Sequence, residues 1–165
     1  LMALLKQFAL DKLASLKDAG IRLRVIGDLS RLPQDTRQAV GRVIAETQSG
    51  QRLNLTVALN YGSQQEIVSA CRRVVRAVMA GILDEADIDQ SAFSARLDTD
   101  GLPDPDLIIR TSGEQRLSNF LLWQSAYSEF FFPVTLWPDF TPEDLIEILG
   151  AYQARDRRFG AVEGE

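Results

Sequence analysis

The sequence predicts an α/β fold in which a parallel sheet is covered by helices on both faces. Short apolar segments typical of buried parallel strands alternate with longer stretches that carry the apolar period of a helix. Such alternation favours a parallel sheet whose strands are joined by helical crossovers. No repeat, low-complexity tract or Gly/Ser-rich linker interrupts the chain, so we predict a single domain over residues 1–165.

Three helices and two strands are expected in the first part of the chain. Residues 1–19 carry apolar residues at helical spacing, and Gly20 suits the position just after a helix end. Pro33 suits the first turn of the next helix, which Gly50 closes. In order, the expected elements are helix 1–19, strand 21–27, helix 33–49, strand 53–60 and helix 64–80.

Shorter elements are expected to follow, before one last helix. Thr141 is predicted to cap this last helix, which starts at Pro142 and runs to about residue 155. The elements expected before it are one or two short helices within 84–96, a strand over 106–110, an arginine-containing loop, a helix around 118–124, and a strand or buried loop over 130–136.

Composition excludes several classes of function. A net charge of −5 leaves no general basic surface for nucleic acid, and the absence of histidine removes imidazole acid–base chemistry and the usual zinc ligands. The single cysteine, Cys71, excludes an internal disulfide and is expected to pack within a helix rather than act as a nucleophile. The 45% hydrophobic content is enough for a core, and no apolar run of about 18 residues predicts a membrane span.

The residues after the strand at 106–110 are typical of an anion site. Arg110 ends the strand, where open α/β sheets bind their ligands, and Arg116 and Ser118 follow within nine residues. A guanidinium fork matches phosphate oxygens, and the helix expected next would add backbone N–H groups, so a diphosphate is the favoured ligand. The alternative is that the arginines pair with neighbouring acids, namely Asp104, Asp106 or Glu114.

Four motifs along the chain carry a family resemblance. They are RLRVIGD at 22–28, LNLTVALNYG at 53–62, RTSGEQRLSNFLLWQSAYSEFFF at 110–132 and RRFG at 157–160, with the tryptophan of LWPDF after the third. In this order and spacing they resemble the cis-prenyltransferase family, and within it the bacterial undecaprenyl diphosphate synthases, over nearly the whole chain. The family's N-terminal DGNGRWA-like loop and serine–asparagine–tryptophan motif are not matched. The chain is therefore expected to be the C-terminal two thirds of a longer protein, with the catalytic aspartate in the unmatched segment, and to be inactive alone.

The resemblance implies a role for several polar residues. Arg110, Arg116, Leu117 and Ser118 would bind the diphosphate of isopentenyl diphosphate. Glu129 would belong to a magnesium site, since carboxylate oxygen suits Mg²⁺; its alternative role is a polar cap on the phenylalanines that follow. Arg158 and Gly160, in the RRFG motif, would reach across a homodimer to the neighbour's diphosphate, although a basic helix end is usually only solvated.

The resemblance also implies a role for several apolar residues. In the resembling family a hydrophobic tunnel holds the growing isoprenoid tail, and Leu1, Leu4, Leu5 and Leu53 would line it. From helical spacing alone, the first three of these leucines are better explained as an ordinary core face. The turn 60–62 is best explained structurally, and Glu66 is a weak candidate for the site.

The function implied is sequential cis-condensation of isopentenyl diphosphate onto an allylic diphosphate such as farnesyl diphosphate, with Mg²⁺ as cofactor. The product would be a long-chain polyprenyl diphosphate, the precursor of a lipid carrier for peptidoglycan synthesis. The expected location is the cytoplasm, with peripheral contact at the inner face of the membrane during product release. One alternative is a non-catalytic partner subunit of a cis-prenyltransferase; another is an unrelated α/β protein that binds phosphate esters.

Overall fold

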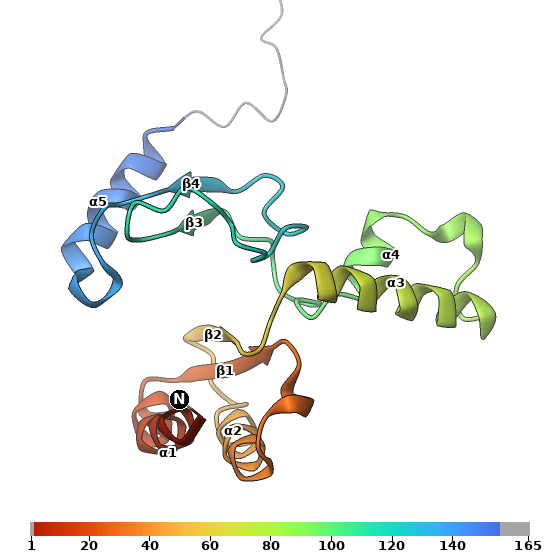
Figure 1. The fold of residues 1–165 in the computed structure, drawn as a ribbon, viewed down its shortest axis with the longest axis horizontal. Coiled ribbons are helices and arrows are strands. Elements are labelled where there is room, and N and C mark those ends of the chain that lie inside the picture. Colours follow the sequence, from red (N-terminus) through yellow and green to blue (C-terminus); the bar gives the residue numbers. More distant parts are fainter. Residues whose placement is uncertain (1, 156–165) are drawn as a thin grey trace, which may run out of the picture. The chain divides into compact units, whose positions relative to one another are not determined.

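The computed structural model describes residues 2–155, in two compact units that meet at Leu102 and Pro103 along the chain (Figure 1). Each unit contains one two-stranded parallel sheet and its own helices. The parallel α/β class predicted from the sequence is therefore confirmed within each unit. That the two units belong to a single domain stays a prediction.

The first unit follows the predicted order of helices and strands closely. Gly20 adopts a left-handed φ of 67° and ends the first helix, as its position in the sequence predicts. Asp28 caps a short 3₁₀ turn, Leu29–Arg31, directly after the first strand. The main elements are α1 (Met2–Asp18), β1 (Ile21–Ile26), α2 (Gln34–Glu46), β2 (Leu53–Ala58), α3 (Ser63–Met79) and α4 (Gln90–Ser94).

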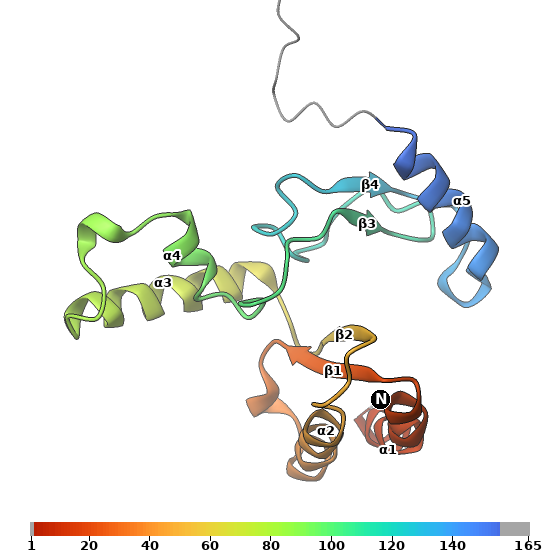
Figure 2. The same ribbon diagram turned by 180° about the vertical axis from the view of Figure 1, so that it is seen from behind.

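The sheet of the first unit has a helical layer on one face. β1 and β2 pair in parallel, from Ile21 opposite Leu53 to Ile26 opposite Ala58. α1 and α2 lie on the same side of these strands in both views (Figures 1 and 2). Val43 of α2 is fully buried there. On the other face of the sheet, the residues of β1 include two arginines. That helices also cover this second face stays a prediction.

The second unit places its strands and last helix around a short parallel ladder. β3 (Leu107–Ile109) pairs with β4 (Glu129–Phe131), and α5 (Pro142–Gln153) packs beside β4. Thr141 caps α5 as predicted, because its hydroxyl accepts the Asp144 amide while the Asp144 carboxylate accepts the Thr141 amide at 2.8 Å.

The helix predicted around 118–124 is not formed, and that prediction was wrong. Ser118, Asn119 and Leu121 have left-handed φ angles of 48°, 63° and 46°, which interrupt a right-handed helix. The segment instead folds as a series of turns, so it offers no helix N-terminus to an anion. Among residues 2–155, no helix is long and apolar enough to cross a membrane.

Candidate functional site

Arg110 and Arg116 line one small cavity in the second unit. Arg110 follows β3 directly, and its backbone N–H extends the ladder by donating to Phe131 O at 2.9 Å. Its guanidinium Nη1 donates to the carbonyl oxygen of Arg116 at 2.7 Å, which holds the loop against the strand end. This cavity, here called the arginine cavity, has a volume of about 190 Å³ and is lined by Ile108, Ile109, Arg110, Arg116, Leu117, Phe120 and Phe132.

The loop between the two arginines is fixed by backbone contacts. The amides of Ser112 and Gly113 donate to the carbonyls of Thr135 and Pro133, each at 2.9 Å. Both donors have left-handed φ angles, 69° and 65°, so the loop turns sharply back toward the segment after β4. A loop held in this way can present its side chains in a fixed arrangement.

The arginine in this loop already has an acidic partner. Arg116 forms an ion pair with Glu114, so the structural alternative considered from the sequence is realised for this residue. The side chains are 62% and 37% exposed, and exposed ion pairs contribute little to stability. An anion that uses both arginines can therefore replace Glu114 at little cost.

The other two residues predicted to bind diphosphate are placed differently from each other. Leu117 lines the arginine cavity, as expected for a residue between Arg116 and the turns. Ser118 is exposed, has a left-handed backbone and is not part of the cavity lining. The structure thus brings together three of the four residues that the sequence assigns to this site.

Glu129 lies at the start of β4 and contacts the end of the last helix. Its Oε2 accepts a hydrogen bond from Arg155 Nη1, and this guanidinium also lies 4.3 Å from the centroid of the Phe131 ring. Glu129 therefore does more than cap the phenylalanine run. Arg155 lies outside the four motifs, and from the sequence it was expected only to belong to a solvated basic end of the last helix; its contact with Glu129 was not predicted.

The residues around Glu129 meet only part of what a magnesium ion requires. No group of three or more Asp, Glu, His or Cys side chains suited to a metal exists among residues 2–155. Magnesium is nevertheless commonly held by one or two carboxylates together with substrate phosphates. The donor type of Glu129 fits such a site as one ligand, with the remaining positions left to other donors.

An apolar cavity of about 410 Å³ lies between the sheet of the first unit and its helices. Leu53, predicted to line a tunnel, is 55% exposed and is not in its lining, whereas Leu55, two residues further along the same strand, is. Leu1 lies outside the described residues, as do the side chains of Leu4 and Leu5. The lining residues are Lys12, Ser15, Leu16, Ala19, Ile21, Leu23, Val25, Val40, Val43, Leu55, Val57 and Leu59.

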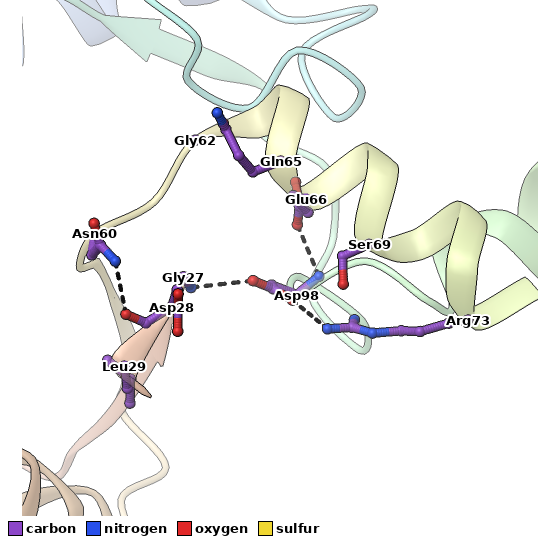
Figure 3. A pocket seen from close by; sticks show the side chains of 10 residues that line it. All are labelled: Gly27, Asp28, Leu29, Asn60, Gly62, Gln65, Glu66, Ser69, Arg73 and Asp98. Atoms are coloured by element: carbon purple, nitrogen blue, oxygen red, sulfur yellow. Dashed lines mark hydrogen bonds and ion pairs between the residues drawn. The ribbon is translucent and has the colours of Figure 1, made fainter. Parts of the chain in front are cut away.

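A polar pocket of about 350 Å³, here called the strand-end pocket, lies at the carboxyl ends of β1 and β2 (Figure 3). Glu66, only 4% exposed, forms part of its wall and accepts hydrogen bonds from Tyr61 Oη at 2.6 Å and from the Asp98 amide at 2.8 Å. Hydrogen bonds from Ser30 to the carboxylate of Asp28 hold the pKa of that carboxyl below its ordinary value. The full lining is Gly27, Asp28, Leu29, Asn60, Gly62, Gln65, Glu66, Ser69, Arg73 and Asp98.

Asp98 joins the elements around the strand-end pocket. Its carboxylate accepts the Gly27 amide and pairs with Arg73, each at 3.2 Å, and its carbonyl accepts Arg24 Nη2 at 2.8 Å. Sequence reasoning missed Asp98, because no local pattern distinguishes it from its acidic neighbours. Glu66, a weak candidate from the sequence, is a buried member of this network, because it accepts the Asp98 amide.

Together these features define a parallel α/β protein with a cavity lined by two arginines in one unit and an apolar cavity in the other. The chain belongs to the family described as putative undecaprenyl diphosphate synthase, whose model matches residues 1–160. Arg158 and Gly160 fall within this match but lie outside the described residues.

Individual relatives agree with the family assignment. An isoprenyl transferase of Geobacter sulfurreducens is 47% identical over 165 residues, which is all of this chain and 67% of the relative. An isoprenyl transferase of Brucella suis is 50% identical over 163 residues, 99% of this chain and 64% of the relative. The chain thus spans about two thirds of the length of the curated relatives it matches.

Solved structures show the same fold. A lavandulyl diphosphate synthase from Lavandula x intermedia, in complex with dimethylallyl diphosphate, matches with a TM-score of 0.92 and 38% identity, over 97% of this chain and 70% of that one. A probable undecaprenyl diphosphate synthase from Campylobacter jejuni matches with a TM-score of 0.83 and 33% identity, over 96% and 72%. The α/β fold is therefore shared with enzymes of prenyl diphosphate metabolism.

Proposed function

We propose that this chain carries the isopentenyl diphosphate site of a cis-prenyltransferase. The observation that carries the proposal is the arginine cavity at the carboxyl end of β3, which both Arg110 and Arg116 line. Arg110 and Arg116 would bind the diphosphate, with Leu117 beside them and Ser118 reached by movement of the turns. Family membership and the names of the relatives support this assignment.

The reaction we propose is condensation with an allylic diphosphate, farnesyl diphosphate being the expected starter. The alkene of isopentenyl diphosphate attacks the allylic carbon, the C–O bond of that carbon breaks so that its diphosphate group leaves, and loss of a proton forms the new cis double bond. The apolar cavity of the first unit suits the growing tail, because burial contributes roughly 0.8 kcal/mol per CH₂ group. In this assignment Leu55 takes the place given to Leu53, while Leu1, Leu4 and Leu5 remain candidates.

Mg²⁺ is the proposed cofactor, with Glu129 as one of its ligands. When bound, the ion would neutralise diphosphate charge and so ease departure of the leaving group. The protein's contribution at this position is a carboxylate on β4 whose present partner is Arg155. The catalytic aspartate expected for the family is assigned to a segment outside these 165 residues, so we expect these residues alone to bind substrate without turnover.

The assembly and setting follow from the same family assignment. We propose a homodimer in which Arg158 and Gly160 reach the partner's diphosphate. The product would be a long-chain polyprenyl diphosphate for peptidoglycan synthesis, made in the cytoplasm and released at the inner face of the membrane. The relatives named above are transferases and synthases, which favours a catalytic chain over a non-catalytic partner subunit.

The test is a condensation assay on the full-length protein with farnesyl diphosphate, isopentenyl diphosphate and Mg²⁺. Arg116→Ala removes a hydrogen-bonded charge worth about 1.5–3 kcal/mol, so KM for isopentenyl diphosphate should rise about 10- to 150-fold. Arg116→Lys keeps the charge but loses the guanidinium fork, and it should fall between Arg116→Ala and the parent. Arg37→Ala, at an exposed arginine of α2, is the matched control. An unchanged KM in Arg116→Ala would remove this residue from the site.

A further inference from the structure

An arginine just after the last helix contacts β4. Arg155 is the second residue after α5, and its guanidinium reaches both Glu129 and Phe131. Those two residues are separated by one position on the strand, so their side chains project from the same face. A carboxylate and an aromatic ring on one face bind a guanidinium through an ion pair and a cation–π contact.

This attachment is more shielded from water than the ion pair of the arginine loop. The Glu129 side chain is 26% exposed and that of Arg155 is 45% exposed, against 37% and 62% for Glu114 and Arg116. Partial burial reduces screening by water and salt, so this ion pair is screened less than the pair of Arg116 and Glu114. In the structure this carboxylate therefore already has a cation.

We infer that Arg155 competes with a divalent cation for the carboxylate of Glu129. The inference rests on the proposed function, which assigns Glu129 to a magnesium site. One carboxylate oxygen is occupied by the guanidinium, and two positive charges close to one carboxylate repel each other. Binding of Mg²⁺ at Glu129 therefore requires Arg155 to leave or to weaken its hold.

The competition links cation binding to the end of α5. Arg155 is followed two residues later by the arginine-containing motif RRFG at 157–160. Its backbone N–H donates to Tyr152 O, and the next amide back, that of Ala154, donates to Gly150 O, each at 3.2 Å. When Arg155 leaves Glu129, the end of α5 loses this ion pair with β4.

The experiment measures Mn²⁺ binding to the full-length protein by electron paramagnetic resonance. In Arg155→Gln the competitor is gone, so Mn²⁺ should bind roughly five-fold more tightly, the upper end for a partly exposed ion pair. Arg155→Lys keeps a competing charge and should remain close to the parent. Arg37→Gln makes the same change of net charge at an exposed position of α2 and is the matched control. Glu129→Gln should abolish the difference between the parent and Arg155→Gln.

A second readout follows the helix end directly by hydrogen exchange. Adding Mg²⁺ to the parent should speed exchange of the Ala154 and Arg155 amides, and it should have no such effect in Glu129→Gln. Equal Mn²⁺ affinity in the parent and Arg155→Gln, or unchanged exchange on adding Mg²⁺, would overturn the inference. Lack of condensation by the parent with Mg²⁺ would instead overturn the proposed function, so the two failures are distinguishable.

Discussion

Gly27 is a position where adding a single methyl group should strongly destabilise the first unit. It follows β1 with a φ of 102°, a conformation that L side chains rarely adopt. A Cβ built there would lie 2.2 Å from the carbonyl oxygen of Leu59 and 3.0 Å from Tyr61 Cα. Both obstacles are backbone atoms, so the clash cannot be relieved by turning a flexible side chain.

The expected cost of Gly27→Ala has two parts. Forcing an L residue into a left-handed backbone costs about 1–2 kcal/mol. Relieving the overlap shifts packed backbone, which costs about 1–3 kcal/mol. The sum, about 2–5 kcal/mol, is a large share of a typical unfolding free energy of about 5–15 kcal/mol. The shift would also disturb the hydrogen bond from the Gly27 amide to Asp98.

The assay is urea denaturation of the parent and variant, with the free energy of unfolding taken from the midpoint and slope. Gly41→Ala is the matched control, because Gly41 lies inside α2 and a Cβ there meets nothing within 4 Å. Gly41→Ala should raise the free energy of unfolding by about 0.5–1 kcal/mol, because alanine has a higher helix propensity than glycine. An ordinary surface substitution changes the free energy of unfolding by about 0.5 kcal/mol or less. If the free energy of unfolding of Gly27→Ala lies within that range of the parent value, the steric argument is refuted.

Two further predictions concern single side chains of the first unit. Tyr61→Phe removes the 2.6 Å hydrogen bond to buried Glu66 and should cost about 1–3 kcal/mol in urea denaturation; a loss below this range would show that water replaces the hydroxyl. The second prediction concerns Glu46. A hydrogen bond from Arg42, and a smaller contribution from Lys17, hold the pKa of Glu46 below 4.5. Because the folded-state pKa is lowered, its contribution to stability is present above pH 4.5 and is lost as pH falls through the folded value. The urea midpoints of the parent and Glu46→Gln should therefore converge in acid, and an equal gap at pH 7 and pH 3 would contradict this.

Local signals in the sequence located most elements of the fold. Gly20 and Thr141 mark the helix ends that the structure shows, because a left-handed glycine and a capping hydroxyl act on their immediate neighbours. The failure at 118–124 has a local cause as well. Its apolar residues have a helical period, but the left-handed backbone at Ser118 and Leu121 interrupts the helix, and a period of apolar residues does not reveal that conformation.

The candidate site could be predicted only where its residues are close in the chain. Arg110 and Arg116 are six positions apart after an apolar strand, so their common cavity was within reach of sequence reasoning. Glu129 and Arg155 are 26 positions apart, and no periodic pattern connects them. Contacts of this kind depend on how separate elements pack, and they appear only in the structure.

The contacts of Asp98 also set an order for folding. Its bond to the Gly27 amide closes a loop of 71 positions, whereas β1 and β2 pair across far fewer residues. Long loops are slow to close, so we expect α1, β1, α2 and β2 to assemble while the strand-end pocket is still open. In pulse-labelled refolding, the Thr47 amide, bonded to Val43 within its own helix, should be protected before the Gly27 amide. Simultaneous protection would mean that the first unit folds in one step. On a ribosome, the same order would leave the pocket unfinished until Asp98 had emerged, 71 positions after Gly27 and long after the sheet could form.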